Sequence, residues 1–588
     1  MTWYTRRVVQ RRGDRTVQLQ RSEPINCDVL VVGGGLAGIM AAIGAKDFAN
    51  EVILVEKGKV SRSGATVFTH GALGPASGDE KEVWVQELAE HSTYLCDQEW
   101  TEILVTEQRD RINDLASWGV PLQRSADGSF ITESGRGQRQ SKIVLYDGKK
   151  MMEVLRKHAL QKGVNLVEKV AVVDLLTSDG RYPTEGRVTG AIGVNVQTGE
   201  IKVISCNAIV LATGMGSLKL HALNMDNVTG DGQAMAYRVG AELAGLEFAM
   251  APTFSIWNRY FCTPSQSQFQ SHGAKIVNSV GERIIEKYFP GQSEQSLDFG
   301  TLCRMVAKET LEGRGPIYFD LREWSDAQID KMRAVQPRTM KGFDRAGVDI
   351  KKQLIETTPM MTGYSASGEG GIRIGKNADT SVTGLYAAGV CALIAANISS
   401  LMGVPQAFCS VAGYRAGENA GKLSTQFDGF EINTDQVELV VEHLAAPFRR
   451  EVGLSPQAIW HKVHEVILPL ERSFFKEEQK IKEVISLLQS IAAEDILNAS
   501  VTDPHDLVKL LEVRNIVQLS ELVYLSALER KESRLTHYRT DYPFRDNEQW
   551  LKWVVIRRRD GGPEVSLEAL PLSSYKFKPS STTVNISI

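Results

Sequence analysis

The sequence predicts an α/β fold in which a Rossmann-like dinucleotide-binding domain carries an inserted α+β capping domain and is followed by a C-terminal helical domain. Three observations support this prediction: a strand–glycine turn–helix unit near the N-terminus, mixed helix and strand signals between residues 248 and 355, and a helical pattern after residue 429. The length of 588 residues corresponds to roughly three to four domains.

The strand–turn–helix unit begins with the apolar residues 29–32, which are typical of a buried parallel strand. Gly33, Gly35 and Gly38 follow as G-x-G-x-x-G at the start of an alanine-rich segment. In such a unit the first glycine allows a tight turn, the second lets a pyrophosphate approach the backbone, and the third allows close helix–strand packing. The free N–H groups at the helix N-terminus favour the phosphates.

A second apolar run, residues 52–55, ends in Glu56, at the place where a carboxylate accepts hydrogen bonds from a ribose. The glycine motif alone is weak evidence, because glycine-rich turns occur in many α/β proteins. The strand before it, the helix after it and the acid at the expected distance together predict dinucleotide binding.

The rest of the chain continues this α/β pattern around one change of character. Residues up to about 24 form an N-terminal extension, and residues 57–78 are a Gly-, Ser- and Thr-rich loop over the cofactor. Apolar spacing predicts helices over 80–118, 151–161, 486–499 and 506–529, and strands over 165–176, 188–196, 208–211 and 384–389. A short tail is expected after the last helix.

Composition excludes several classes of protein. A net charge of −4 gives no reason to expect nucleic acid as a partner. No run approaches the ~20 apolar residues that span a bilayer, so an integral membrane protein is not expected. The Arg-rich start (residues 6–21) is either a docking arm or a solvated strand and tail, and no apolar segment follows it as in a secretory signal.

The seven cysteines are scattered and form no C-x-x-C. This pattern argues against a disulfide framework, a structural zinc site or an iron–sulfur cluster within this chain, and it predicts reduced thiols in a cytoplasmic enzyme. His461 and His464 are spaced i, i+3 but have no nearby cysteine or paired acids, so we expect no metal site.

Four further motifs, in order along the chain, carry a resemblance to a known family. They are T-G-D-G at 229–232, E-G-R-G at 312–315 with D-L-R at 320–322, G-L-Y-A-A-G at 384–389, and E-S-R at 532–534 with D-Y-P at 541–543. Over nearly its whole length the chain resembles the flavoprotein subunits of fumarate reductase, succinate dehydrogenase, L-aspartate oxidase and adenylylsulfate reductase.

The resemblance implies FAD in the glycine-rich fold and a division into four parts. Residues 1–247 are then the first part of the FAD-binding domain, 248–355 the capping and substrate domain, 356–428 the second part of the FAD-binding domain, and 429–588 the helical domain and tail. By motif and resemblance, we expect the following residues to hold the cofactor: Gly33, Gly35, Leu36, Ala37, Gly38, Glu56, Lys57, Ser63, Gly64, Ala65, Thr66, His70, Gly71, Ala171, Ala212, Thr213, Gly214, Asp231, Gly389, Val404 and Pro405.

The loop after the second strand indicates how the flavin is held. Family members with covalent FAD attach it through a histidine in an S-H-T stretch, whereas residues 61–66 here read S-R-S-G-A-T. R-S-G-A resembles the adenylylsulfate reductase version, in which FAD is not covalently bound, so we expect dissociable FAD. His70 stands near the flavin ring by resemblance, where it either bonds the flavin or packs in the loop.

The residues that bind dicarboxylates in the family are missing. Ala251 stands near a histidine position and Gln270 at an arginine position, residues 362–371 contain no histidine, and residues 399–403 lack the last arginine. Because every side chain that would pair with a dicarboxylate is missing, we expect a different substrate that carries less negative charge. Candidate acid–base groups remain in His272, Lys275, Tyr364 and Glu369, each of which has an equally simple structural reading.

These observations predict an FAD-dependent oxidoreductase flavoprotein that transfers a hydride between flavin and a small non-dicarboxylate organic molecule. The resemblance implies that the electron partner is a separate iron–sulfur, ferredoxin-like small subunit, and homo-oligomerisation stays open. Two alternatives remain: sulfur chemistry like that of adenylylsulfate reductase, favoured by the R-S-G-A loop, and an electron-relay or assembly subunit without a substrate of its own, favoured by the missing site residues.

Overall fold

The structure, a computed structural model, describes residues 19–74, 80–134, 138–219, 227–258, 261–263, 266–297, 299–364, 368–396, 398, 401–580 and 583–586. The side chains of residues 251–255, 257, 258, 261–263, 266–268, 299, 335, 338 and 362 are not described. Most of the Arg-rich start therefore lies outside the described residues, and Arg21 pairs with Glu438.

The N-terminal part forms the nucleotide-binding sheet and the helices that cover it. Its elements are β1 (Ile25–Val32), α1 (Leu36–Ala45), β2 (Val52–Glu56), the 3-10 helix η1 (Thr66–Phe68), β3 (Gly71–Leu73), α2 (Glu80–His91), α3 (Gln98–Ser117), β4 (Thr132–Glu133), β5 (Ile143–Leu145), α4 (Gly148–Gln161), β6 (Asn165–Glu168), β7 (Val170–Thr177), β8 (Val188–Asn195), β9 (Ile201–Leu211), β10 (Gly216–Ser217), α5 (Asp231–Arg238), β11 (Leu243–Ala244) and the 3-10 helix η2 (Leu246–Phe248).

The main sheet has the strand order β6-β2-β1-β9-β8-β7, and β18 (Leu385–Ala387) also pairs with β9. The strands β2, β1, β9 and β18 run parallel, with Val29 opposite Val52 and Leu385 opposite Ile209. The chain thus returns, after the inserted domain, to the strand next to β1. This arrangement confirms the predicted α/β fold.

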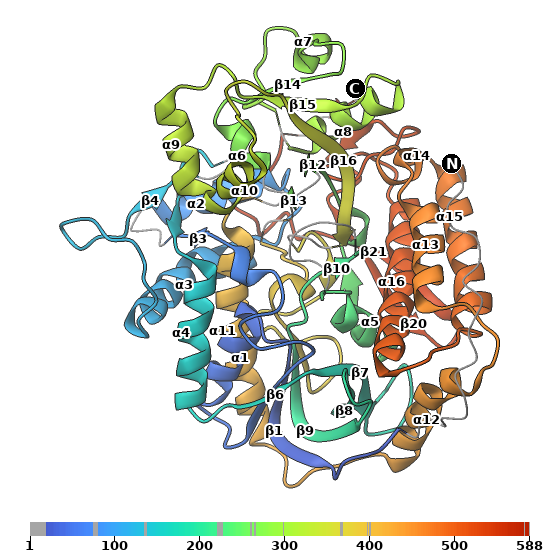
Figure 1. The fold of residues 1–588 in the computed structure, drawn as a ribbon. Helices are drawn as coiled ribbons and strands as arrows, with labels where there is room; N and C mark the ends of the chain where they lie inside the picture. Colours follow the sequence, from blue (N-terminus) through green and yellow to red (C-terminus); the bar gives the residue numbers. More distant parts are fainter. Residues whose placement is uncertain are drawn as a thin grey trace.

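Helices α1 and α11 (Val404–Ser424) pack together against this sheet (Figure 1). Gly413, Gly417 and Gly421 are spaced by one helical turn and face the backbone of α1. A Cβ added at Gly417 would lie 1.9 Å from the carbonyl oxygen of Ala41. The close approach of the two helices therefore depends on this row of glycines.

The inserted domain has its own sheet. It comprises β12 (Met250–Asn258), β13 (Phe261–Thr263), α6 (Gln266–Ser271), β14 (Lys275–Val277), α7 (Ile284–Tyr288), α8 (Phe299–Leu311), β15 (Ile317–Asp320), α9 (Asp326–Val335), α10 (Pro337–Ala346) and β16 (Ile355–Tyr364). The strand order is β13-β12-β16-β15-β14, and β10 also pairs with β16. The capping sheet thus continues to Tyr364, the last residue of β16.

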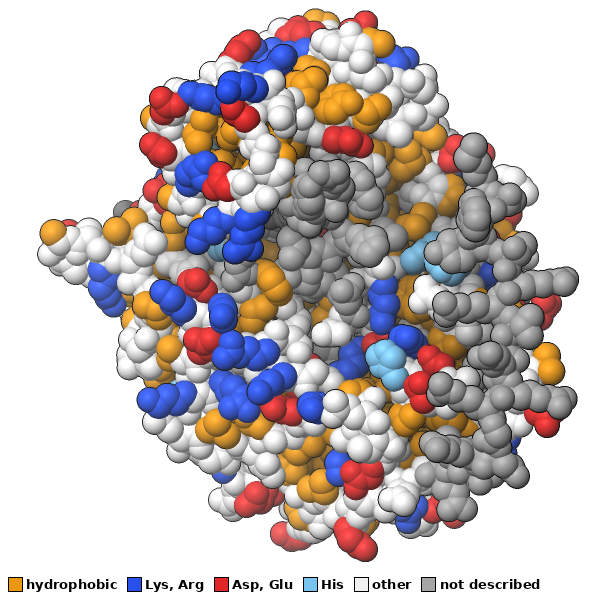
Figure 2. Space-filling model, in the orientation of Figure 1, with side chains coloured by type: hydrophobic (Ala, Val, Ile, Leu, Met, Phe, Trp, Pro, Cys, Tyr) orange, Lys and Arg blue, Asp and Glu red, His pale blue; other side chains and the backbone are white. Residues whose placement is uncertain are grey.

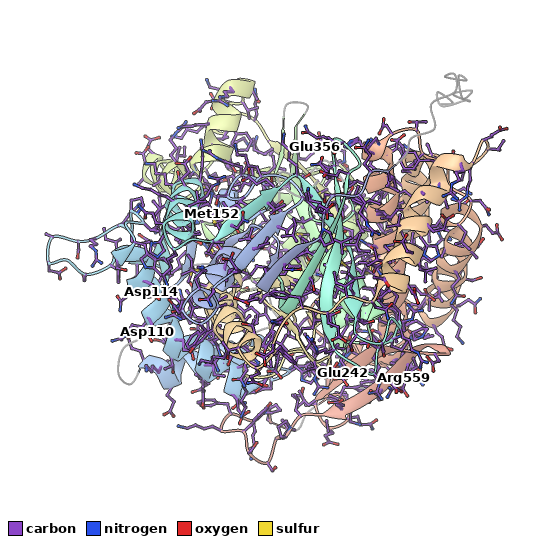
Figure 3. All side chains as sticks on the ribbon, turned by 90° about the horizontal axis from the view of Figure 1, so that it is seen from below. Asp110, Asp114, Met152, Glu242, Glu356 and Arg559 are labelled. Carbon is purple, nitrogen blue, oxygen red and sulfur yellow. The ribbon has the colours of Figure 1, made fainter. Side chains whose placement is uncertain are left out.

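The C-terminal part packs against the other side of the molecule, where Figure 1 draws it in orange and red. It follows β17 (Gly371–Ile372) and the 3-10 helix η3 (Gly389–Cys391), and contains α12 (Thr434–Ala445), η4 (Ala446–Arg449), α13 (Pro456–Ile467), α14 (Leu470–Ser473), α15 (Glu478–Ser490), the π-helical turn η5 (Ile491–Ile496), α16 (Pro504–Glu529), β19 (Phe544–Asp546), β20 (Lys552–Arg559), β21 (Gly562–Ala569) and β22 (Thr583–Asn585). Figure 3 shows Asp110 and Asp114 of α3 on one flank of the molecule, away from Glu242 and Arg559.

Two segments show detail that the sequence did not predict. Residues 80–118, whose apolar spacing is helical, form two helices, because Asp97 caps α3 through the backbone N–H groups of Glu99 and Trp100 and the residues Thr93 and Tyr94 have positive φ. The short tail contains the hairpin β20–β21, which completes a sheet with β11 and β17. The apolar run in β20, residues 553–556, is only four residues long, so the sequence alone did not predict this strand.

Candidate cofactor-binding site

A cleft with about 1030 Å³ of empty space lies at the carboxyl ends of β1, β2 and β9. In open α/β sheets, ligands bind outside these strand ends. Seventeen of the residues expected at the cofactor line the cleft: Gly33, Gly35, Leu36, Ala37, Glu56, Lys57, Ser63, Gly64, Ala65, Thr66, Ala171, Ala212, Thr213, Gly214, Asp231, Gly389 and Pro405.

The three glycines of the first turn differ in what surrounds them. Gly33 has φ of +110°, and an added Cβ would lie 2.3 Å from the carbonyl oxygen of Ala212. A Cβ on Gly38 would lie 1.8 Å from the carbonyl oxygen of Gly33, whereas on Gly35 its nearest neighbour would be Thr66 Oγ1 at 3.6 Å. Gly33 and Gly38 are therefore required by packing, and Gly35 leaves room for a ligand.

The carboxylate of Glu56 holds two backbone segments at the end of β2. It accepts hydrogen bonds from the N–H of Gly34 at 2.6 Å and from that of Gly58 at 2.8 Å. Both the glycine turn and the loop after β2 are thereby fixed to the end of the same strand. Glu56 itself lines the cleft.

The loop after β2 forms one wall of the cleft. Ser63 Oγ accepts a hydrogen bond from the N–H of Lys59 at 2.8 Å, and Thr66 Oγ1 accepts one from the N–H of Leu36, at the start of α1, at 3.3 Å. Among the residues that the structure describes along this cleft there is no histidine. The described wall thus offers no imidazole for a covalent bond to a cofactor.

Lys57 occupies the polar end of the cleft. Its ammonium group donates to Thr229 Oγ1 at 3.0 Å, Asp231 Oδ2 at 2.9 Å and Glu512 Oε1 at 2.8 Å. Glu512 belongs to α16 in the C-terminal part, and it also pairs with Lys219. Helix α16 is therefore tied directly to the wall of the cleft.

The charges of this cluster stabilise one another. Burial alone lowers the pKa of Lys57, but Asp231 and Glu512 outweigh it, so the pKa is raised and the ammonium stays charged. Burial alone raises the pKa of Asp231, but Lys57 and the hydrogen bonds from Asn515 and Thr229 outweigh it, so this pKa is lowered. Both groups are ionised at neutral pH.

Four of the expected cofactor residues do not line the cleft. Gly38 packs under the turn, and Val404 starts α11 beside the lining residue Pro405. Gly71 pairs with Leu145 between β3 and β5. His70 is half-buried and its carbonyl oxygen accepts a hydrogen bond from the N–H of Tyr146.

The four acid–base candidates are not brought together in the cleft. His272 is half-buried and its carbonyl oxygen accepts a hydrogen bond from Gln328. Lys275 lies on the edge strand β14 and pairs with the exposed Glu323. Tyr364 is buried at the end of β16 and its hydroxyl donates to Ser520 Oγ at 2.8 Å; burial raises its pKa. Glu369 is buried, next to β17.

Gln270, at the position that carries arginine in the resembling family, is bonded to the backbone of the capping domain. Gln270 is buried and its amide donates to the carbonyl oxygens of Glu294 at 2.7 Å and Leu297 at 3.2 Å, inside the capping domain. The side chain of Ala251 and residues 365–367, 399 and 400 lie outside the described parts of the chain.

Two buried cysteines lie at or beside the cleft. Burial raises the pKa of Cys391 to about 11 and of Cys409 to about 12, so both thiols stay protonated.

Twelve residues that were not among the expected cofactor residues also line the cleft: Val32, Gly34, Val55, Val170, Val172, Met215, Asn227, Val228, Ala388, Val390, Gln406 and Cys409. Several of them, such as Gly34 and Val390, adjoin motif residues, so extending each motif by one position would have found them. Glu512 had no such signal, because it stands within a long and largely buried helix far along the chain.

Segments between residues 32 and 409 thus build one cleft on a Rossmann-like sheet, and Glu512 of the C-terminal part is tied to it through Lys57. This is the architecture of a flavoprotein. Comparison with known proteins agrees. Residues 28–404 match the FAD binding domain family, and residues 467–584 match the fumarate reductase flavoprotein C-terminal family. The chain therefore belongs to the FAD-binding flavoproteins of the fumarate reductase and succinate dehydrogenase family, and it is an FAD-dependent oxidoreductase.

Relatives and solved structures are similar along almost the whole chain. A fumarate reductase (CoM/CoB) chain from Methanothermobacter marburgensis is 26% identical over 559 residues, which cover 92% of this chain and 98% of the relative. The fold is that of E. coli quinol fumarate reductase (TM-score 0.82, 24% identity, 95% of this chain and 99% of that one). Adenylylsulfate reductase from Archaeoglobus fulgidus has the same fold (TM-score 0.77, 20% identity, 95% and 98%).

Two further features do not occur in the described residues. Nowhere among them do three or more His, Cys, Asp or Glu side chains lie so that they could hold a metal ion. In the same residues no helix is both long enough and apolar enough to cross a membrane.

Proposed function

We propose that this protein transfers a hydride between non-covalently bound FAD and a small organic molecule that is not a dicarboxylate, and exchanges the electrons with an iron–sulfur, ferredoxin-like protein in the cytoplasm. The observation that carries this proposal is the cleft itself. It joins the open turn at Gly35, the Lys57–Asp231 pair and the Ser63–Thr66 wall, which contains no histidine.

The residues of the chain fit FAD as follows. The backbone N–H groups at the start of α1 would bind the diphosphate, since an amide nest at a helix N-terminus favours phosphate. Glu56 keeps the turn and the loop in place, and the Lys57–Asp231 pair orients the ribityl region. When bound, FAD supplies the two-electron chemistry that no side chain of the protein can perform.

A substrate other than a dicarboxylate is supported by the capping domain. A dicarboxylate needs fixed cations around it, but Gln270 stands at one family arginine position and bonds only to backbone. Lys275 is engaged by Glu323 at the outer edge of the capping sheet. The substrate site would therefore be less cationic than that of the family enzymes.

We propose His272 as the first acid–base residue to examine, with Lys275, Tyr364 and Glu369 as further candidates. A His272→Gln variant should lower turnover far more than it lowers FAD content. An unchanged turnover number would remove His272 from the mechanism.

Denaturation in acid tests how the flavin is held. Non-covalent FAD should remain in the supernatant, whereas flavin in the precipitated polypeptide would contradict the proposal. A purified protein that is colourless, and stays so with added FAD, would contradict the function as a whole.

The sequence has no histidine or arginine at the family positions 251, 270, 362–371 and 399–403. This also favours a second function, an electron relay without a substrate of its own. The two functions differ in one measurement. Reduced flavin that is reoxidised by an iron–sulfur partner but by no molecule in a panel of small organic substrates would indicate the relay.

A further inference from the structure

One exposed surface is strongly basic although the chain as a whole has a net charge of −4. It consists of Lys59 and Arg62, in the loop after β2, and of Lys149, Lys150 and Lys157, on α4; all five are exposed. We call it the α4 basic surface. Figure 2 shows lysine and arginine side chains gathered over the area where Figure 1 draws α4 and this loop.

The loop and α4 form one continuous surface. Arg62 pairs with Glu153 of α4 at 3.0 Å, and Lys149, Glu153 and Lys157 follow one another at i, i+4 spacing on one helix face. The start of α4 also packs on η1, because a Cβ added at Gly148 would lie 2.4 Å from the carbonyl oxygen of Thr66.

Four of the five cations of this surface have no acidic partner in the part of the chain that the structure describes, whereas Arg62 pairs with Glu153. Among the described residues, no acidic side chain pairs with Lys59, Lys149, Lys150 or Lys157. Asp147 and Glu153 are the acidic residues of α4 and its cap, and Asp147 is already bonded to the N–H groups of Lys149 and Lys150. The unpaired lysines keep this surface positively charged, so it would attract the carboxylates of an acidic partner.

The inner side of the same loop lines the cofactor cleft. Ser63, Gly64, Ala65 and Thr66 face the cleft, while Lys59 and Arg62, in the same turn, face solvent. A protein bound to the α4 basic surface is therefore separated from the cleft by a single loop. This position suits an electron carrier and gives no advantage to nucleic acid or lipid.

We propose that the α4 basic surface is the docking site of an acidic, one-electron redox protein. This inference rests on the proposed function, because it identifies where the electron partner binds. In the direction tested below, two reduced iron–sulfur proteins each donate one electron to the oxidised flavin, which also takes up protons from water.

The test mixes the FAD-loaded protein with a photoreduced, acidic [2Fe–2S] ferredoxin and follows the bleaching of the flavin. A Lys149→Glu, Lys150→Glu double variant should lower the second-order rate by about tenfold or more at low ionic strength, because it reverses the field that steers the encounter. The rates of wild type and variant should converge at high ionic strength, where surface charges are screened.

Two controls separate docking from other effects. A Lys341→Glu, Lys531→Glu variant makes the same charge change on exposed lysines of α10 and of the segment after α16, and should keep the wild-type rate. Both variants should keep wild-type FAD content and wild-type reduction by dithionite, since none of these lysines lines the cleft.

Equal ferredoxin rates for the two variants, with normal flavin content, would overturn the docking site but leave the proposed function intact. A protein that binds no FAD at all would overturn the proposed function instead. Loss of binding to double-stranded DNA or to phosphatidylserine vesicles in the Lys149→Glu, Lys150→Glu variant, with an unchanged ferredoxin rate, would assign this surface to another class of partner and overturn the proposal.

Discussion

Glu512 and Lys57 form an ion pair of 2.8 Å although 455 residues separate them in the sequence. Lys57 directly follows β2 of the nucleotide-binding sheet, and Glu512 lies on α16 of the C-terminal part. Because Lys57 also holds Asp231 in the wall of the cleft, the C-terminal helices take part in shaping the cofactor site.

A Glu512→Gln variant should therefore weaken FAD binding without a direct contact to FAD. Loss of the carboxylate leaves Lys57 and Lys219 short of one negative charge, and breaking such a buried pair costs about 3–5 kcal/mol at most. We expect a clear rise in the Kd for FAD, measured by titrating the apoprotein. Glu529→Gln, an exposed position on the same helix, should leave the Kd unchanged, and an equal Kd for both variants would show that the ion pair does not act on the site.

Alanine substitutions at two glycines of the first turn should affect different properties, the stability of the fold at Gly38 and the affinity for FAD at Gly35. In Gly38→Ala the added methyl group would collide with the carbonyl oxygen of Gly33, so the variant should lose about 1–3 kcal/mol of stability. In Gly35→Ala the nearest atom to the methyl group would be Thr66 Oγ1, at an ordinary contact distance of 3.6 Å, so the fold should survive while FAD affinity falls. Thermal unfolding of the apoproteins and FAD titration measure the two effects, and a Gly35→Ala variant that binds FAD normally would contradict the expected seat of the diphosphate.

The contact between α1 and α11 should tolerate no added side chain at Gly417. An alanine there would push the helices apart, since its Cβ would lie 1.9 Å from the carbonyl oxygen of Ala41, at a cost of about 1–3 kcal/mol. Urea unfolding measures this loss. Gly561→Ala adds the same methyl group where no atom lies within 4 Å and should not change stability; a Gly417→Ala variant as stable as Gly561→Ala would show that the helices can separate freely.

Lys476 should make stability depend on pH. Burial, together with the positive charges of Arg539 and Arg304, lowers its pKa from the ordinary 10.5 to about 7. Between these two values the unfolded chain binds a proton that the folded chain does not, so the free energy of unfolding rises with pH across this range.

Replacement by an uncharged side chain of similar size should remove this contribution. Lys476→Met should be more stable than wild type near pH 7, and its advantage should shrink as the pH approaches 10, because each pKa unit between the two states is worth about 1.4 kcal/mol. Melting temperatures across this range measure the difference. Lys480 pairs with Glu477 near the surface, so the melting temperature of Lys480→Met should change with pH as that of wild type does. If the melting temperature of Lys476→Met also followed wild type across this pH range, the lowered pKa of Lys476 would be contradicted.

The amino-acid sequence was sufficient to predict the parts whose physics is local. Gly33, Gly35 and Gly38 between an apolar strand and an alanine-rich helix define a phosphate-binding turn, because only glycine permits the backbone path and the close approach. The same holds for Glu56 at the strand end and for the loop without histidine at 61–66. These features predicted the fold and most of the residues that line the cleft.

Which distant residues meet depended on the packing of the whole chain. Nothing in the sequence near Glu512 indicates that it reaches Lys57, and residues 553–556 become a strand because β11 and β21 pair with them. Likewise, His272 and Lys275 were grouped with Tyr364 and Glu369 by resemblance, whereas the capping sheet places them in different surroundings. Such contacts depend on the relative placement of whole elements, which the packing of the complete core fixes and which no local pattern of residues encodes.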